Sequence, residues 1–139
     1  MNIFLTVALA ILSFTVSAAD QPIDCYNSRD VQSTIDMNEC LSNNSVLAEA
    51  EMNKYLQASL DTNANDPEVV KLIKIAQKDW ETYQSSNCDS VYTLWKGGSI
   101  KNAMSINCST RLTKQRTLEL WESYLTSVDG SPPLLPEPK

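Results

Sequence analysis

Four cysteines constrain the fold of this 139-residue chain more than any other feature: Cys25, Cys40, Cys88 and Cys108. They are separated by 15, 48 and 20 residues without a C-x-x-C pair, which argues against a redox motif or a zinc ribbon. An even number of cysteines in an oxidising compartment is typical of a disulfide framework. Three connectivities are open, and the local one, Cys25 with Cys40 and Cys88 with Cys108, is the simplest.

The N-terminal segment predicts that the chain reaches an oxidising compartment. Residues 3–16 are apolar except for two threonines and one serine, and the small residues Ser17-Ala18-Ala19 follow. We therefore expect residues 1–19 to form a signal peptide, and the mature protein to be periplasmic or secreted. A lipid anchor would need a cysteine directly after the cleavage site, and Cys25 lies too far along the chain, so we expect no membrane anchor.

The composition excludes several classes of function. The sequence contains no histidine, which rules out Ser-His-Asp triads, Cys-His dyads and histidine-ligated zinc. Its 17 acidic and 11 basic residues give a net charge of -6, whereas proteins that bind nucleic acid carry a basic patch. An acidic surface instead favours a basic partner and accelerates the encounter with it.

Helical periodicity covers most of the mature chain. Apolar residues recur at three- and four-residue steps from Ser33 to Leu60, with a break or a new helix start left open at residues 43–45. A second helix is expected from Asp66, an N-cap followed by Pro67, and a third from Ser99 to about Ser127. No alternation typical of strands appears. We predict an all-α fold, a small disulfide-bonded antiparallel bundle of about three main helices.

The second helix carries an apolar stripe at steps of four and three residues: Val69, Ile73, Ala76, Trp80 and Tyr83. We expect the core to form where the second and third helices meet, with four large side chains largely buried: Trp80, Tyr83, Leu118 and Trp121. Three lysines of the second helix lie off this stripe and are expected to form a solvated surface: Lys71, Lys74 and Lys78.

Carboxylate pairs are the remaining catalytic candidates in a chain without histidine. Asp79 and Glu81 flank Trp80, but residues two apart on a helix point to different faces. Glu119 and Glu122 are three residues apart and could meet, although they lie among residues expected to be exposed. Neither pair lies in a recognisable motif. We therefore predict no enzymatic activity, no cofactor and no metal site.

Several short motifs follow one another along the mature chain. They are residues 34–40 (TIDMNEC), 51–55 (EMNKY) and 76–83 (AQKDWETY), then Cys88, Gly97-Gly98-Ser99, Cys108 and residues 113–116 (TKQR). In this order they resemble the lysozyme inhibitor LprI-like family, over about Cys25 to Leu120. The chain departs from the family pattern at Gln84-Ser85, where an Arg-Asp pair is frequent, and at Glu49 and Glu51, where Asp is common.

The resemblance implies a small, exported, helical and disulfide-bonded bacterial module. It would comprise a helical LprI-like domain over residues 20–128. The four prolines after Ser131 separately predict a flexible Pro-rich tail over residues 129–139. The implied function is that of a binding protein similar to a proteinaceous lysozyme inhibitor, whose partner would be lysozyme or another basic cell-wall hydrolase. The alternative is a structural or interaction module of the envelope with no enzyme target.

Lys96, Gly97, Gly98 and Ser99 form the best candidate for the binding site. A lysozyme cleft contains two carboxylates, and this small turn offers one ammonium and one hydroxyl group to them. The structural interpretation is that the glycines end one helix and Ser99 caps the next. Both interpretations can hold together because a capped turn is also a rigid platform for a contact.

Overall fold

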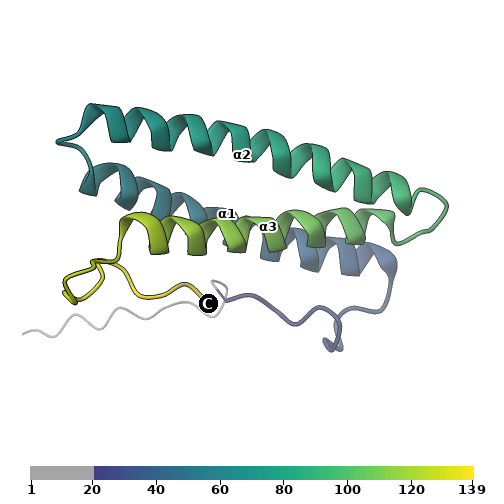
Figure 1. The fold of residues 1–139 in the computed structure, drawn as a ribbon. Helices are drawn as coiled ribbons and strands as arrows, with labels where there is room; N and C mark the ends of the chain where they lie inside the picture. The colour runs from purple at the N-terminus through teal and green to yellow at the C-terminus, as the bar shows by residue number, and fades with distance from the viewer. Residues whose placement is uncertain (1–20) are drawn as a thin grey trace, which may run out of the picture.

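Three long helices, joined by two short turns, make up most of the protein (Figure 1). The computed structural model describes residues 21–139, so the predicted signal peptide, residues 1–19, lies outside the described residues. The helices are α1 (Thr34–Thr62), α2 (Pro67–Leu94) and α3 (Lys101–Tyr124), and residues 21–139 contain no strand. The predicted all-α bundle is therefore confirmed. None of the helices in the described part has an apolar stretch long enough to cross a membrane.

Polar side chains fix the first turns of α1 and α2. The Ser33 hydroxyl accepts a hydrogen bond from the backbone N–H of Asp36, and the Asp36 carboxylate accepts one from the N–H of Ser33, which is a capping box. Hydrogen bonding, first of all with Ser33, lowers the pKa of Asp36 below its ordinary value. At α2, the Asp66 carboxylate accepts from the N–H groups of Glu68 and Val69, next to Pro67.

The first helix runs without interruption through residues 43–45, where the sequence is compatible with either a break or a new helix start. Asn44, a weak helix former, lies on the side of α1 that faces the N-terminal segment. Its side-chain amide donates to the carbonyl of Ile23 at 2.7 Å and accepts from the N–H of Ile23 at 2.9 Å. This pair of bonds gives Asn44 a tertiary role within the helix, and the helix therefore does not need to end there.

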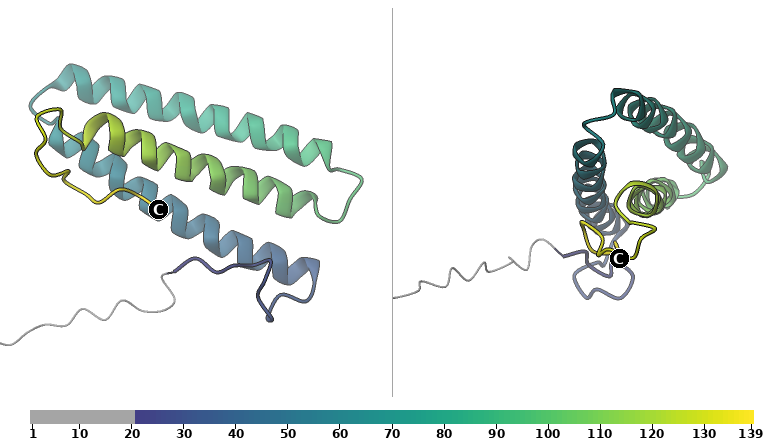
Figure 2. Two further views of the ribbon diagram at one scale, coloured as in Figure 1. Left: turned by 60° about the horizontal axis from the view of Figure 1, so that its bottom comes forward. Right: turned by 60° about the vertical axis from the view of Figure 1, so that its left-hand side comes forward.

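The last helix in the chain is the central one in space. α3 packs against both α1 and α2, whereas α1 and α2 contact one another only slightly. The end-on view in Figure 2 shows α3 in the angle between the other two helices. The main core cluster joins α1 to the C-terminal half of α3 and consists of Met52, Tyr55, Leu120 and Leu125.

The core differs in part from the one expected where the second and third helices meet. Trp80 and Trp121 are half-buried and pack against the main core cluster, and Leu118 is half-buried, but Tyr83 is 55% exposed. The prediction for Tyr83 is wrong because two glutamines, not further apolar residues, continue the inward face of α2. That face consists of Ile73, Gln77, Trp80, Gln84 and Cys88.

Two disulfides and two extended segments complete the fold. The disulfides join Cys25 to Cys40, with an S–S distance of 2.05 Å, and Cys88 to Cys108, with an S–S distance of 2.07 Å. They have the local connectivity predicted from the sequence. The N-terminal segment and the segment after α3 lie on the side of α1 and α3 that faces away from α2 (Figure 2).

The segment after α3, expected from its prolines to be a flexible tail, forms two hydrogen bonds with the helices and one with the C-cap residue of α3. The N–H of Leu134 donates to the carbonyl of Leu125 at 3.2 Å, and the indole N–H of Trp121 donates to the carbonyl of Leu135 at 2.9 Å. The hydroxyl of Tyr55 donates to the carbonyl of Pro136 at 2.7 Å. Residues 134–136 thus extend across α3 to α1, and Leu135 packs against the main core cluster.

Candidate functional site

The α2–α3 turn, residues 95–100, holds all four residues of the predicted binding site. Successive backbone hydrogen bonds shape it: the N–H of Lys96 donates to the carbonyl of Thr93 at 3.2 Å, and the N–H of Gly98 to that of Trp95 at 2.9 Å. The turn forms one tip of the molecule, at the opposite end of α2 from the α1–α2 turn (Figure 1).

The capping roles expected in this turn are wrong. The C-cap of α2 is Trp95, before the glycines, and the N-cap of α3 is Ile100, with no side-chain cap hydrogen bond. Neither Gly97 nor Gly98 has a positive φ, and no atom lies within 4 Å of a Cβ placed on Gly97. Within residues 21–139, no hydrogen bond uses the side chain of Lys96 or Ser99. The ammonium and hydroxyl groups at this tip are therefore available to a partner.

Large apolar side chains surround these polar groups. The exposed ones are Tyr92, Leu94, Trp95 and Ile100, and Leu94 is 79% exposed. The ammonium group of Lys101 lies over the ring of Tyr92, 5.2 Å from its centroid, in cation–π geometry. Clusters of exposed apolar side chains mark interaction surfaces, whereas single exposed apolar residues are common.

The tip also lies in a basic part of an acidic chain. Residues 90–118 contain five basic residues and no acidic one: Lys96, Lys101, Arg111, Lys114 and Arg116. All 17 acidic residues of the chain lie outside this range. The α2–α3 turn and α3 as far as Leu118 therefore carry positive charge only, and the acidic residues of α3, Glu119 and Glu122, lie in its last turns, away from the tip.

The second disulfide joins α2 and α3 close to the tip. Cys88 and Cys108 bring α2 and α3 to a Cα–Cα distance of 5.6 Å, and the Ser105 hydroxyl donates to the carbonyl of Cys88 at 3.3 Å. Cys88, Cys108 and Leu112 are buried together in a small cluster. The bond therefore limits how far the two helices can separate beneath the turn.

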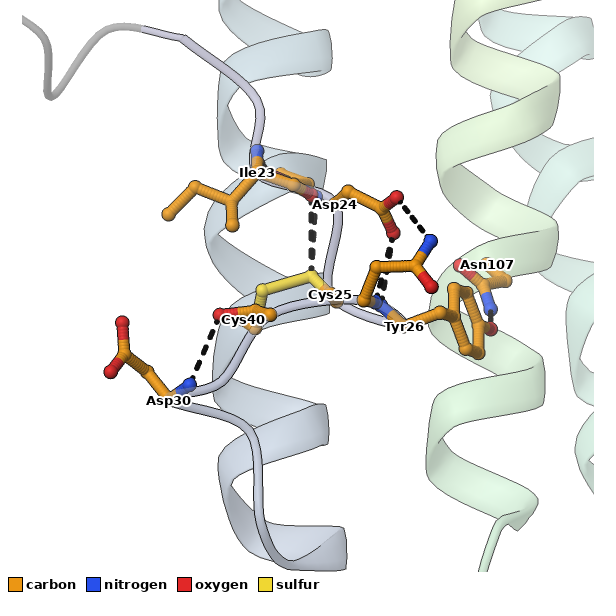
Figure 3. Close-up of a disulfide and its surroundings, with 10 residues drawn as sticks. Ile23, Asp24, Cys25, Tyr26, Asp30, Cys40 and Asn107 are labelled. Carbon is orange, nitrogen blue, oxygen red and sulfur yellow. Dashed lines mark hydrogen bonds between the residues drawn. A yellow bond between two sulfur atoms is a disulfide. The ribbon is translucent and has the colours of Figure 1, made fainter.

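The first disulfide attaches the N-terminal segment to α1 and, through Tyr26, to α3. Figure 3 shows the Cys25–Cys40 bond and the Tyr26 ring, whose hydroxyl accepts a hydrogen bond from the Asn107 side chain. In the same segment the Asn27 side chain donates to Asp24 at 2.6 Å, and this bond is the main cause that lowers the pKa of Asp24. Since Asn107 neighbours Cys108, the two disulfide-bonded regions meet along α3.

A family model described as lysozyme inhibitor LprI matches residues 25–120. The chain belongs to the LprI family. An uncharacterized protein of Rhizobium meliloti strain 1021 is 31% identical over 116 residues, which cover 75% of this chain and 81% of that protein. No solved structure matches the chain. The LprI region includes both disulfides and the whole α2–α3 turn.

Sequence reasoning missed a buried polar layer within the LprI region. The guanidinium of Arg116 donates from Nε to Gln77 Oε1 and from Nη1 to Glu119 Oε2, both at 3.1 Å, while its Nη2 is buried without a hydrogen-bond partner. Gln77 in turn donates to Glu81 at 3.2 Å. Two of the carboxylates considered as catalytic candidates, Glu81 and Glu119, are thus acceptors in this network.

Two of the four residues that depart from the family pattern line the same pocket. Glu49 of α1 and Gln84 of α2 line one small pocket of about 290 Å³, whose lining also includes Trp80, Glu81 and Thr113. Gln84 donates to the hydroxyl of Thr113 at 2.8 Å. Gln77 and Gln84 are seven residues apart, about two helical turns, so they lie on the same face of α2. This spacing is the sequence feature that could have indicated a partly polar inward face.

Proposed function

We propose that this protein binds and inhibits a basic cell-wall hydrolase of the lysozyme type, with the α2–α3 turn as the inserted element. The single observation that carries the proposal is the exposed tip. There the side chains of Lys96 and Ser99, which form no hydrogen bond within residues 21–139, lie among large apolar groups. Membership of a family described as lysozyme inhibitors supports the same function. In this role the protein is a binding protein without catalytic activity of its own.

The chemistry of the target suits this tip. Lysozyme-type hydrolysis uses two carboxyl groups that flank the glycosidic bond, one of them protonated. An ammonium group placed between them would pair with the ionised carboxylate and exclude substrate and water. The hydroxyl of Ser99 can donate a hydrogen bond to the same carboxylates, as a short neutral side chain beside the cation.

Apolar neighbours would supply most of the binding energy. Interfaces depend on a few buried aromatic and aliphatic anchors, while polar contacts set the orientation. Leu94 and Trp95 immediately precede Lys96 in the sequence, and both are exposed. A tip with these anchors fits a saccharide cleft, which is itself concave and partly apolar.

The two disulfides support an extracytoplasmic location, because structural disulfides persist in oxidising compartments. We propose that residues 1–19 direct export as a cleaved signal peptide and that the protein acts in the periplasm or after secretion. A basic hydrolase that enters the envelope from outside would meet it there.

The test is a turbidity assay of cell-wall lysis by lysozyme, with residues 20–139 as the inhibitor. Lys96→Ala is expected to weaken inhibition by about tenfold, the effect of losing one charge-assisted contact of about 1.4 kcal/mol. Lys114→Ala is the matched control, because Lys114 is an exposed lysine of α3 away from the tip. Equal inhibition by the two variants, with equal thermal stability, would place the contact elsewhere.

The alternative function, an envelope interaction module without an enzyme target, gives a different result in this assay. The wild-type protein would then leave lysis unchanged at micromolar concentration. Trp95→Ser separates the two functions further, because it removes an anchor of the tip and leaves both disulfides in place. An inhibitor loses activity with this change.

A further inference from the structure

A second surface lies far from the tip, between α1 and α2 beside the turn that joins them. It is a groove of about 940 Å³, lined by the apolar side chains Leu60, Ala64, Pro67, Val70 and Ile75. On the α1 side Gln57 and Asp61 also line it, and the Gln57 amide donates to the Asp61 carboxylate at 2.8 Å. The groove exists because α1 and α2 contact each other only slightly, each packing mainly on α3. Its α2 residues lie outside the inward face that begins with Ile73 and Gln77.

Three lysines run along the α2 side of this groove. Lys71, Lys74 and Lys78 also line it, at steps of three and four residues that place them on one face of the helix. Within residues 21–139 the one ion pair joins Arg116 to Glu119, so none of these three ammonium groups has a carboxylate partner in the described chain. A protein of net charge -6 therefore presents a local row of positive charge beside an apolar groove.

We propose that this groove docks an acidic amphipathic helix of a partner protein. Its apolar face would cover Leu60, Val70 and Ile75, and its carboxylates would pair with the lysine row. Residues at i, i+3 and i+7 of a helix repeat along one side with the same spacing as Lys71, Lys74 and Lys78. A helix laid along α2 can thus match all three charges without bending, in the helix-in-groove mode of recognition.

The shape of the groove favours a helix over a small molecule. Pockets for small ligands enclose most of the ligand surface, whereas this groove is a trough between two helices, open to solvent along one side. The α2 residues that line the groove run from Pro67 to Lys78, about 16 Å at 1.5 Å per residue, which is long enough for about three helical turns of a partner. Large exposed grooves of this kind take macromolecular partners.

Charges beyond the groove set the direction of the docked helix. Farther from the α1–α2 turn, the same two helices line the small pocket that contains Glu49 and Glu81. A helix carries partial positive charge at its N-terminus and partial negative charge at its C-terminus. The N-terminus of the partner therefore lies near these carboxylates and its C-terminus near the lysine row, so that the partner runs parallel to α1.

This site is independent of the proposed hydrolase contact. The groove lies at the α1–α2 end of the molecule and the tip at the α2–α3 end (Figure 1). The two surfaces also select opposite partners, one basic and one acidic. One protein could therefore hold a hydrolase at one end while the other end is attached to an acidic protein of the envelope.

The experiment uses residues 20–139 and a fluorescein-labelled peptide of about 18 residues, long enough for helix formation, built from Leu, Ala and Glu. Its glutamates stand at i, i+3 and i+7 along one edge of an apolar face, and binding is followed by fluorescence anisotropy. Micromolar binding that induces helical circular dichroism in the peptide is expected. A shuffled peptide of the same composition, without an apolar face, should bind at least about tenfold more weakly.

Charge reversal in the protein provides the decisive comparison. The triple variant K71E/K74E/K78E should weaken peptide binding by about tenfold or more, while R29E/K114E/K139E, of equal net charge, should change it less than about threefold. Equal losses in both variants, or binding of dodecanoate but not of the peptide, would overturn the proposal. Hydrolase inhibition should be the same in the groove variant and its control of equal net charge, so failure here is distinguishable from failure of the proposed function.

Discussion

At the scale of single residues, Arg116 shows how a polar side chain can determine packing. The residue is 9% exposed, and it joins Gln77 of α2 to its own helix through Nε and Nη1. Burying a guanidinium is costly unless its hydrogen bonds are satisfied, and Nη2 lacks one. Arg116 belongs to the TKQR motif found in the sequence, but that motif does not predict its burial, which follows only from the arrangement of α2 and α3.

A double-substitution cycle tests this coupling. Arg116→Met leaves the Gln77 carbonyl oxygen without its donor in a buried position, and we expect a loss of about 1–3 kcal/mol of unfolding free energy. Adding Gln77→Leu removes the orphaned acceptor and should recover part of that loss. Urea denaturation of the four proteins gives the coupling energy. Simple additivity of the two losses would show that the pair is not coupled.

Tyr55 gives a prediction about pH. Burial raises the pKa of its phenol above the ordinary value of 10.0, and nearby Glu51 contributes to the rise. The folded state therefore favours the neutral phenol, and this stability is complete below pH 10 and is lost as the pH rises through the folded-state pKa. We expect Tyr55→Phe to lose less stability than the wild type between about pH 9 and about pH 11.

The same substitution has a cost at neutral pH. It removes the hydrogen bond from the Tyr55 hydroxyl to the carbonyl of Pro136, worth about 1 kcal/mol. Chemical denaturation at each pH measures both effects, with Tyr83→Phe as the control because Tyr83 is exposed. A parallel pH dependence of Tyr55→Phe and the wild type would contradict the linkage.

At the scale of helices, local sequence signals predicted where helices start, but hydrophobic periodicity did not correctly predict which residues of α2 face the core. Asp66 followed by Pro67 placed the start of α2 correctly, because a cap acts through a few neighbouring atoms. The predicted apolar stripe differs from the buried face of α2 because hydrophobic periodicity assigns Tyr83 to the core and Gln77 and Gln84 to the surface. Their hydrogen bonds to Arg116 and Thr113 make both glutamines suitable for the interior, and such partners lie on another helix.

Alanine substitutions test the corrected face of α2. Trp80→Ala should cost about 3 kcal/mol, because Trp80 packs against two of the buried clusters. Tyr83→Ala should cost about 0.5 kcal/mol, as expected for an exposed position. Thermal and urea denaturation give both values. A larger cost for Tyr83→Ala would restore the stripe inferred from the sequence.

At the scale of the whole molecule, the separation of charge has two consequences for a hydrolase partner. The negative charge outside residues 90–118 attracts a basic enzyme from a distance, while the positive tip makes the local contact. The sequence alone led to this turn through its glycines and Lys96. The exposed Tyr92 and Leu94 were not recognised as part of the tip, because solvent exposure depends on where the helices end.

Salt separates the two electrostatic roles kinetically. Long-range attraction is screened over about 8 Å at physiological ionic strength, so the association rate with lysozyme should fall by about tenfold between low and physiological salt. The dissociation rate should change much less, since it depends on close contacts. Surface plasmon resonance measures both rates. A salt effect confined to dissociation would contradict steering by the acidic surface.

The central position of α3 determines when the protein can fold. α1 and α2 alone bury little of each other, so a chain that emerges from its N-terminus gains no complete core until α3 has followed. Before that point only the Cys25–Cys40 bond, closed within one short segment, can form between native partners. The chain therefore remains without its native core through most of its synthesis, and the last helix completes the bundle.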